Sequence, residues 1–432
     1  MNPREGGPRV GHERFRKVER MDHLLTMEIQ ERRKSLRGFP RLRATSTAVM
    51  LERVPAVGRA VLDLEQRPIL VFWETTKACG LACRHCRASA ISQPLRGELT
   101  TAHAARFVDS LAGFGMPRPV LVATGGDALL RHDLDAMLER ARALKVPVAL
   151  APSVTPLLTD ERVAELHRAG VNVVSISLDG ATPATHDGVR GVEGHFAETV
   201  AALRRLREGG LAVQVNTVVM RDTVEELPAV ARIVKESGAS VWEVFFLVRV
   251  GRGRALGELT PAENEDVCHF LVDASRYGFI VRTVEAPFFR RVVALRKHDP
   301  GDAHAHVGAT YGLGPLYEQL AAALRAELGG PASSPRAQTK GTRDGRGIVF
   351  VAHDGEIHPS GFLPLSLGNV RHDEIVRVYR EHPLLRRIRA ADFGGRCGRC
   401  PYRELCGGSR ARAYASAGDP LAEDPACAYQ PA

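Results

Sequence analysis

Three closely spaced cysteines, Cys79, Cys83 and Cys86, are the residues of this 432-residue chain whose types and spacing best suit chemistry. They stand in the segment KACGLACRHC, directly after an apolar run that predicts a strand. Three thiolates on one loop can hold three irons of a [4Fe-4S] cubane and leave the fourth iron open. A zinc site or chance thiols are the alternatives, but zinc ordinarily takes four ligands and no local fourth is present. The spacing therefore predicts an open [4Fe-4S] cluster.

A second group of cysteines lies near the end of the chain. Cys397, Cys400 and Cys406 form a CxxCx5C pattern, and Cys427 follows downstream. Four thiolates complete a closed iron–sulfur site without an exchangeable ligand. Structural zinc at the same four cysteines is the alternative, because CxxC pairs serve both metals. The remaining cysteine, Cys268, is expected in the core.

Strands and helices alternate between the two groups of cysteines. Apolar β-branched runs predict strands at 69–75, 120–126, 146–151, 171–179, 212–219 and 241–248, and amphipathic stretches predict helices at 101–114, 133–144, 159–169, 195–208 and 223–237. Continuous apolar strands are typical of a parallel sheet covered by helices. The pattern predicts an α/β fold, a partial (β/α)6 barrel whose chemistry lies at the carboxyl ends of the strands.

The pattern loosens after residue 248. We expect a helix at 262–277, a strand at 279–284, a helix at 316–327, a hairpin turning at Asp354-Gly355 and a helix at 373–390. The predicted organisation is a basic, mostly disordered segment at 1–50, a barrel at 51–285, a flexible linker with a helix at 286–346, and a small cysteine-rich domain at 347–432.

Composition excludes some classes of protein. The formal net charge is +9, and much of the excess lies near the N-terminus. A solvated basic tail explains this better than specific nucleic-acid binding, because no recognisable module accompanies the charge. No apolar run has the length of a membrane span or the form of a signal peptide. Since nothing marks the chain for export, we expect a cytoplasmic protein without a membrane span, and tight cysteine clusters in such a chain indicate metal sites.

Further motifs support the interpretation of the first cysteines. TGGD at 124–127 and SISLDG at 175–180 stand at the ends of predicted strands, and THDGVRG follows at 185–191. With KACGLACRHC they make the chain from residue 68 to about residue 250 resemble the radical S-adenosylmethionine (SAM) superfamily. The resemblance implies a [4Fe-4S] cluster that reductively cleaves SAM to a 5′-deoxyadenosyl radical for hydrogen abstraction.

The same resemblance implies roles for six residues that would bind SAM. Gly125, Gly126 and Asp127 would hold its amino group, and Asp127 stands where Glu is commoner. Ser153 would contact the ribose, Ser177 the SAM moiety, and Arg190 the SAM carboxylate, which suits a guanidinium fork. Turn glycines, a core serine and a surface arginine are the alternatives for single members of this set. No catalytic residue is identified.

The C-terminal cysteines resemble the SPASM/twitch-like auxiliary-cluster extension of many radical SAM enzymes. The resemblance implies a second [4Fe-4S] auxiliary cluster held by Cys397, Cys400, Cys406 and Cys427. A third cluster is not expected, because its ligand positions fall at Val349, Ser360 and Ser409, which cannot replace thiolates.

Longer segments resemble one branch of the superfamily. FWETTKACGLACRHCRA, VWEVFFLVRVGRG and GEIHPSGFLPLSLGNVR are similar to the branch of the alternative-pathway heme synthase and the heme d1 maturation enzyme. This implies an oxidoreductase of heme-biosynthesis type that oxidatively modifies or decarboxylates a small anionic, tetrapyrrole-like substrate such as a porphyrin. It also implies a reduced flavodoxin- or ferredoxin-type electron donor.

Two groups of residues are candidates for contact with such a substrate. Arg249, Arg252, Arg254, Arg282, Arg290 and Arg291 could form a cationic rim for carboxylates, and His298, His304 and His306 could touch a metalloporphyrin. Solvated arginines and a mobile polar loop are the alternatives. Two other functions stay open: a radical SAM maturase of a ribosomally made peptide, and a non-enzymatic iron–sulfur sensor or scaffold.

Overall fold

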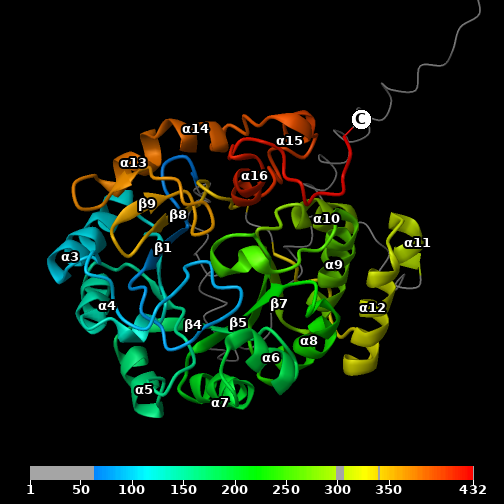
Figure 1. Ribbon diagram of the computed structural model, residues 1–432, viewed down its shortest axis with the longest axis horizontal. Coiled ribbons are helices and arrows are strands. Elements are labelled where there is room, and N and C mark those ends of the chain that lie inside the picture. The colour runs from blue at the N-terminus through cyan, green and yellow to red at the C-terminus, as the bar shows by residue number, and fades with distance from the viewer. Residues whose placement is uncertain (1–62, 298–305, 339–340, 432) are drawn as a thin grey trace, which may run out of the picture. The chain divides into compact units, whose positions relative to one another are not determined.

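The computed structural model of this protein describes residues 63–297, 306–338 and 341–431 (Figure 1). The N-terminal segment predicted to be disordered, at 1–50, lies outside the described residues, as do His298 and His304. Within the described ranges, no helix is long and apolar enough to cross a membrane.

Seven parallel strands form the body of one sheet. They are β1 (Leu70–Glu74), β2 (Val120–Thr124), β3 (Val148–Leu150), β4 (Val171–Ser177), β5 (Ala212–Val219), β6 (Val241–Phe246) and β7 (Ile280–Val284). The strand order is β10-β9-β8-β1-β2-β3-β4-β5-β6-β7, so β7 and β10 are the edges and the barrel is open. This confirms the predicted partial barrel, which β7 extends.

Helices surround the sheet on its outer face (Figure 1). They are α3 (Thr101–Ser110), α4 (Leu134–Ala143), α5 (Asp160–Arg168), α6 (Pro183–Arg190), α7 (His195–Glu208), α8 (Leu227–Glu236) and α9 (Pro261–Ala274). Threonine begins several of them: Thr100, Thr159 and Thr260 accept backbone hydrogen bonds in the first turns of α3, α5 and α9. Such a cap stabilises a helix by about 1 kcal/mol.

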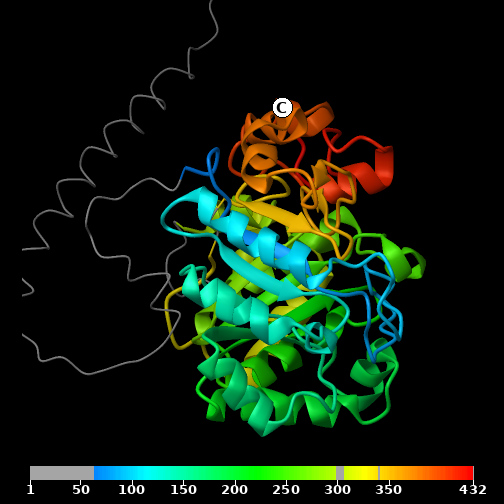
Figure 2. The same cartoon turned by 90° about the vertical axis from the view of Figure 1, so that its left-hand side faces the viewer.

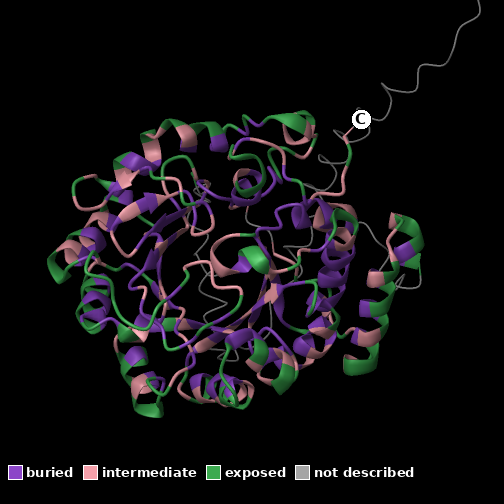
Figure 3. Ribbon diagram, viewed as in Figure 1, coloured by how far each residue is buried: buried purple, intermediate pink, exposed green. Residues whose placement is uncertain are grey.

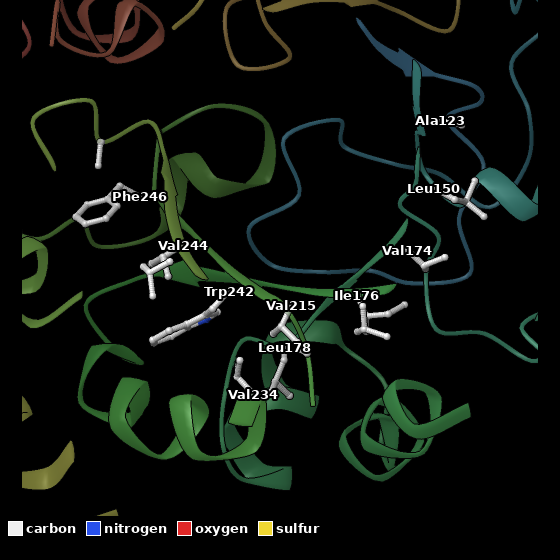
Figure 4. Close-up of a cluster of buried hydrophobic side chains, with 14 of the residues drawn as sticks. Ala123, Leu150, Val174, Ile176, Leu178, Val215, Val234, Trp242, Val244 and Phe246 are labelled. Carbon is white, nitrogen blue, oxygen red and sulfur yellow. The ribbon is translucent and has the colours of Figure 1, made fainter. Parts of the chain in front are cut away.

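The two faces of the sheet differ in polarity. On the outer face, Trp242, Val215 and Ile176 are fully buried and pack toward the helices (Figure 4). β5 alternates buried and half-buried residues along its length, and its half-buried positions include Gln214 and Asn216. Figure 3 shows the buried residues on the strands and on the inward sides of the helices. The inner face of β5 is therefore more polar and more accessible than its outer face.

The C-terminal region begins within the barrel sheet. β8 (Ile348–Val351) pairs in parallel with β1, and it pairs antiparallel with β9 (Glu356–His358) through the predicted turn at Asp354-Gly355. The short strand β10 (Gly368–Asn369) completes this edge. The sheet thus continues across the domain boundary that the sequence predicts at residue 347.

Four helices follow, gathered at one end of the barrel (Figure 2). They are α13 (Ile375–Glu381), α14 (Pro383–Arg389), α15 (Gly395–Arg399) and α16 (Arg410–Ala417). The single helix predicted at 373–390 is wrong, because Pro383 restricts the residue before it: His382 adopts φ −57° and ψ 127°, and the helix ends there.

The predicted linker at 286–346 contains more helix than expected. Its described residues form α10 (Phe289–Arg296), α11 (Val307–Tyr311) and α12 (Pro315–Leu328). α12 matches the helix predicted at 316–327 and packs against α8 and α9.

Candidate active site

The first three cysteines lie together on residues 75–91, here named the cluster loop, which follows β1. Cys79 and Cys83 are each 8% exposed and pack with Leu81 and Ala90, and half-buried Cys86 joins them. Leu81 N donates to Cys79 Sγ at 3.4 Å, and Ala90 N donates to Cys86 Sγ at 3.5 Å. Three sulfurs gathered on one loop with amide donors beside them fit the ligand set of an open [4Fe-4S] cluster.

The glycine motif after β2 supports the cluster loop through its backbone. Gly126 N donates to Thr76 O at 2.8 Å, and Asp127 N donates to Ala78 O at 2.7 Å. A Cβ atom at Gly126 would lie 2.1 Å from Ala78 O, and one at Gly125 would lie 2.6 Å from Thr76 O. Only glycine allows this approach, so the two glycines set the distance between β2 and the cysteines.

Asp127 is buried, and both oxygens of its carboxyl bind the protein. Oδ1 accepts hydrogen bonds from the N–H groups of Leu129 at 3.1 Å and Ser153 at 3.2 Å, and Oδ2 accepts one from Thr155 Oγ1 at 3.0 Å. Burial raises the pKa of Asp127, although these hydrogen bonds oppose the shift. Ser153 Oγ lies 3.3 Å from Cys79 Sγ. Asp127 therefore fixes Ser153 beside the cluster loop, and its predicted contact with SAM stays a prediction.

Arg190 ends α6 with its guanidinium against the cluster loop. Its Nη1 lies 3.5 Å from Cys83 Sγ, and its Nη2 lies 2.5 Å from Asp179 Oδ2. His85 Nε2 lies 2.8 Å from the same carboxylate oxygen. Burial alone would raise the pKa of Asp179, but Arg190 and His85 hold it well below its ordinary value. The charged Asp179 therefore ties α6 and the cluster loop to the end of β4.

Two polar groups near the end of β4 lack a hydrogen-bond partner among the described residues. One is the buried Nε of Arg190, and the other is the side chain of Ser177, the half-buried last residue of β4. A buried donor left unpaired costs about 1–3 kcal/mol. The position therefore fits a ligand with acceptor oxygens, such as the carboxylate of SAM.

Sequence reasoning missed Arg252 as a support of the cluster loop. Its Nε donates to Cys83 O at 2.8 Å, its Nη1 donates to Ala90 O at 2.9 Å, and its backbone N donates to Cys86 O at 3.0 Å. Asp179 and His85 were missed as well, although Asp179 stands inside the quoted motif SISLDG. A polar residue just after a barrel strand was the available signal for Asp179.

The six arginines predicted to form a cationic rim lie in different surroundings. Arg290 is buried and donates to Leu405 O at 3.3 Å and Cys406 O at 3.4 Å, while Arg291 pairs with Glu265. Arg282 Nη2 donates to Gln338 Oε1 at 2.9 Å on the inner side of β7. Arg249 and Arg254 are exposed. The side chains of Arg252, Arg290 and Arg291 therefore bind other parts of this protein. The prediction that they form a cationic rim for substrate carboxylates is wrong for these three.

The four C-terminal cysteines also come together. Cys397, Cys400, Cys406 and Cys427 line one cavity of about 30 Å³. Gly408 N donates to Cys406 Sγ at 3.4 Å, and Arg410 Nη2 lies 3.7 Å from Cys397 Sγ. Four sulfurs around one cavity fit a closed metal site. In the described part of the chain, no three His, Cys, Asp or Glu side chains are arranged as ligands of one metal ion; in a cubane each thiolate binds a different iron.

Val349, Ser360 and Ser409 stand at the positions where a third cluster would have its ligands. Val349 is fully buried in β8, and Ser360 is buried. Ser409 caps α16 by accepting from Arg412 N at 2.9 Å, and its Oγ donates to the buried carboxyl of Glu285. A hydroxyl with these two bonds acts as a helix cap and an anchor to the end of β7.

Comparisons with known proteins agree with this geometry. Residues 73–234 match the Radical SAM superfamily. The chain is 34% identical over 373 residues to the AdoMet-dependent heme synthase of Methanosarcina barkeri, covering 86% of this chain and 99% of the relative. It is 30% identical over 368 residues to the pre-heme d1 synthase of Dinoroseobacter shibae, covering 83% of this chain and 85% of the relative.

Solved structures share the fold at lower identity. The crystal structure of Streptococcus suis SuiB bound to S-adenosylmethionine matches with a TM-score of 0.61 at 14% identity, over 84% of this chain and 78% of that one. Taken with the sequence relatives, this confirms the predicted fold and family. The chain belongs to the radical SAM superfamily of enzymes, in the branch that holds the AdoMet-dependent heme synthases and pre-heme d1 synthase.

Proposed function

We propose that this enzyme oxidatively modifies a carboxylate side chain of a tetrapyrrole, most simply by decarboxylating a propionate. Two findings together carry the proposal. Cys79, Cys83 and Cys86 lie on one loop, and the chain is similar to a heme synthase over 99% of that relative's length. When bound, a [4Fe-4S] cluster with SAM supplies a 5′-deoxyadenosyl radical that abstracts hydrogen from carbon.

The residues of this chain would hold and orient those groups. Cys79, Cys83 and Cys86 would ligate the cluster, while the two glycines after β2 and the Asp127–Ser153 contact keep the loop in place. Arg190 would bind the SAM carboxylate through its unpaired Nε, with Asp179 fixing the plane of the guanidinium. Gly125, Gly126, Asp127, Ser153 and Ser177 complete the proposed SAM site at the ends of β2, β3 and β4.

The C-terminal cysteines would serve the oxidative half of the reaction. Loss of a propionate carboxylate as carbon dioxide, after hydrogen abstraction from the adjacent chain, forms a vinyl group and leaves one electron to remove. A second [4Fe-4S] cluster at Cys397, Cys400, Cys406 and Cys427 would accept that electron, and its four thiolates leave no iron open to substrate. A reduced flavodoxin or ferredoxin would supply the electron that starts the reaction.

The test is anaerobic turnover of the reconstituted, full-length enzyme with iron-coproporphyrin III and with metal-free coproporphyrin III. We expect 5′-deoxyadenosine together with a porphyrin product that has lost carbon dioxide and two hydrogen atoms per modified propionate, detected by mass spectrometry. 5′-Deoxyadenosine without any change in either porphyrin would contradict the proposed substrate, and it would direct attention to a peptide. No 5′-deoxyadenosine at all would favour an iron–sulfur sensor.

A further inference from the structure

One histidine on the inner face of the sheet has no role in the proposed SAM site. His358, the last residue of β9, lies opposite Phe350 of β8 in the antiparallel register. Val349, Val351 and Ile357 on these strands are fully buried. Because successive side chains alternate between faces, Phe350 and His358 share the other face, which is the inner face of the barrel.

His358 lies one aromatic ring away from the cluster loop. Its imidazole stacks on Phe350 with ring centroids 5.9 Å apart and an interplanar angle of 12°. The guanidinium of Arg87, the residue after Cys86, lies 4.5 Å from the centroid of the same Phe350 ring. Arg87 Nη1 also donates to Gly361 O at 3.2 Å, just beyond His358 in the chain. These contacts hold the segment that carries His358 against the cluster loop.

The other histidines near this end of the barrel are already engaged. His85 pairs with Asp179 at 2.8 Å, and His353 Nδ1 lies 2.8 Å from Glu74 Oε2. Burial alone would raise the pKa of Glu74, but Arg87 and His353 lower it to about 2, so this carboxylate stays charged and keeps both partners. His353 is therefore not free to bind a further ligand.

His358 is different, because within the described residues its ring forms no hydrogen bond and no ion pair, and it is half-buried. Burial lowers the pKa of His358, and Arg87 adds to the shift, while Glu356, Asp354 and Glu74 oppose it. The imidazole is then neutral near neutral pH. A neutral imidazole with an unpaired ring nitrogen is the form that binds iron.

Two phenylalanine rings offer an aromatic surface for a flat ring. One is close to His358 in the chain, and the other comes from β6. Phe362 follows it by four residues and contacts Phe245 of β6, with ring centroids 6.3 Å apart. Both rings are half-buried. Aromatic rings favour offset stacking on other flat π-systems, so this pair offers a face to a macrocycle.

We propose that His358 is an axial ligand to the iron of an iron-tetrapyrrole substrate and thereby sets the position of the macrocycle relative to the cluster loop. The inference rests on the proposed function, since it needs a tetrapyrrole that carries iron. The coordinate bond fixes the height of the ring, and Phe245 and Phe362 supply the apolar contact. His358 is thus a substrate-binding residue that selects for metallated porphyrin.

The test compares binding of two probes, ferric coproporphyrin III and metal-free coproporphyrin III, to reconstituted full-length protein. We expect the wild type to give the Soret and low-temperature EPR spectra of imidazole-ligated ferric iron. His358→Ala should lose that spectrum and bind the ferric probe about tenfold more weakly, which corresponds to about 1.4 kcal/mol. The affinity for the metal-free probe should be the same in both proteins.

Two controls separate ligation from damage to the fold. His132→Ala removes a histidine whose side chain is 80% exposed and should leave both spectra unchanged. Added imidazole should restore the ligated spectrum of His358→Ala. A His358→Ala protein with the wild-type spectrum and affinity overturns the assignment while the proposed function stands. Failure of the wild type to bind either porphyrin overturns the proposed function and this inference together.

Discussion

The two cysteine groups of this protein are built in opposite ways. Cys79, Cys83 and Cys86 lie on one loop, and residues that follow β2, β3 and β6, together with Arg190 at the end of α6, support it from outside. The C-terminal four extend over residues 397–427 and enclose one cavity. Three ligands held from outside suit a cluster that must admit another molecule, whereas four that surround a cavity suit one that exchanges only electrons. The two groups thus differ in both the number and the spread of their thiols.

The largest expected effect comes from removing the first group. We expect that Cys79→Ala, Cys83→Ala and Cys86→Ala together abolish formation of 5′-deoxyadenosine, because no other described cysteine lies on the cluster loop. The protein should keep about four irons at the C-terminal site. Chromatographic assay of 5′-deoxyadenosine together with iron analysis checks this. Undiminished cleavage of SAM in the variant would contradict the assignment of these cysteines as ligands of the SAM-cleaving cluster.

Removing the second group should give a smaller and different loss. With Cys397, Cys400, Cys406 and Cys427 changed to Ala, the cluster loop keeps all its ligands, so some uncoupled SAM cleavage should persist. The porphyrin product should disappear, because the substrate electron has no acceptor. Both products are measured in the same reaction, and equal, unimpaired yields of both would show that the C-terminal site is dispensable.

A single arginine that supports the loop should give the smallest effect. Arg252→Met removes two hydrogen bonds to Cys83 O and Ala90 O, each worth about 1.5–3 kcal/mol for a charged donor. We expect the cluster of this variant to be lost several-fold faster to a chelator, with the folded structure retained by circular dichroism.

The matched control for that variant is Arg254→Met, two residues along the same turn of 3-10 helix and exposed. It should retain iron like the wild type. Equal rates of iron loss in Arg252→Met and Arg254→Met would show that Arg252 does not stabilise the cluster loop.

The sequence predicted the strands and most barrel helices, since their apolar patterns are local and strong. The helix predicted at 195–208 has those bounds in the structure. The break before Pro383 was missed, although proline restricts the conformation of the residue before it. The glycine motif stands at the end of β2, as the sequence predicted, and a Cβ atom at Gly126 would lie 2.1 Å from Ala78 O, which leaves room for glycine alone.

Tertiary contacts decide the rest. Arg252 and Arg254 look alike in the sequence, yet one supports the cluster loop and the other is exposed. His353 and His358 are close in the chain, but only His353 meets a buried carboxylate. The carboxylate of Asp127 binds Ser153 and Thr155, contacts that its motif does not reveal, while its predicted role in binding SAM stays a prediction. Such differences depend on which partner lies opposite, and no local pattern records that.

Metal analysis of the reconstituted wild-type protein tests the contrast between the two sites most directly. Our account predicts about eight irons per chain and no zinc, as two four-iron clusters require. The triple variant and the quadruple variant should each retain about half of that iron. Four irons with one zinc would establish zinc at the C-terminal cysteines, and about twelve irons would reveal a third cluster. Either result would contradict the assignment of one open and one closed cluster.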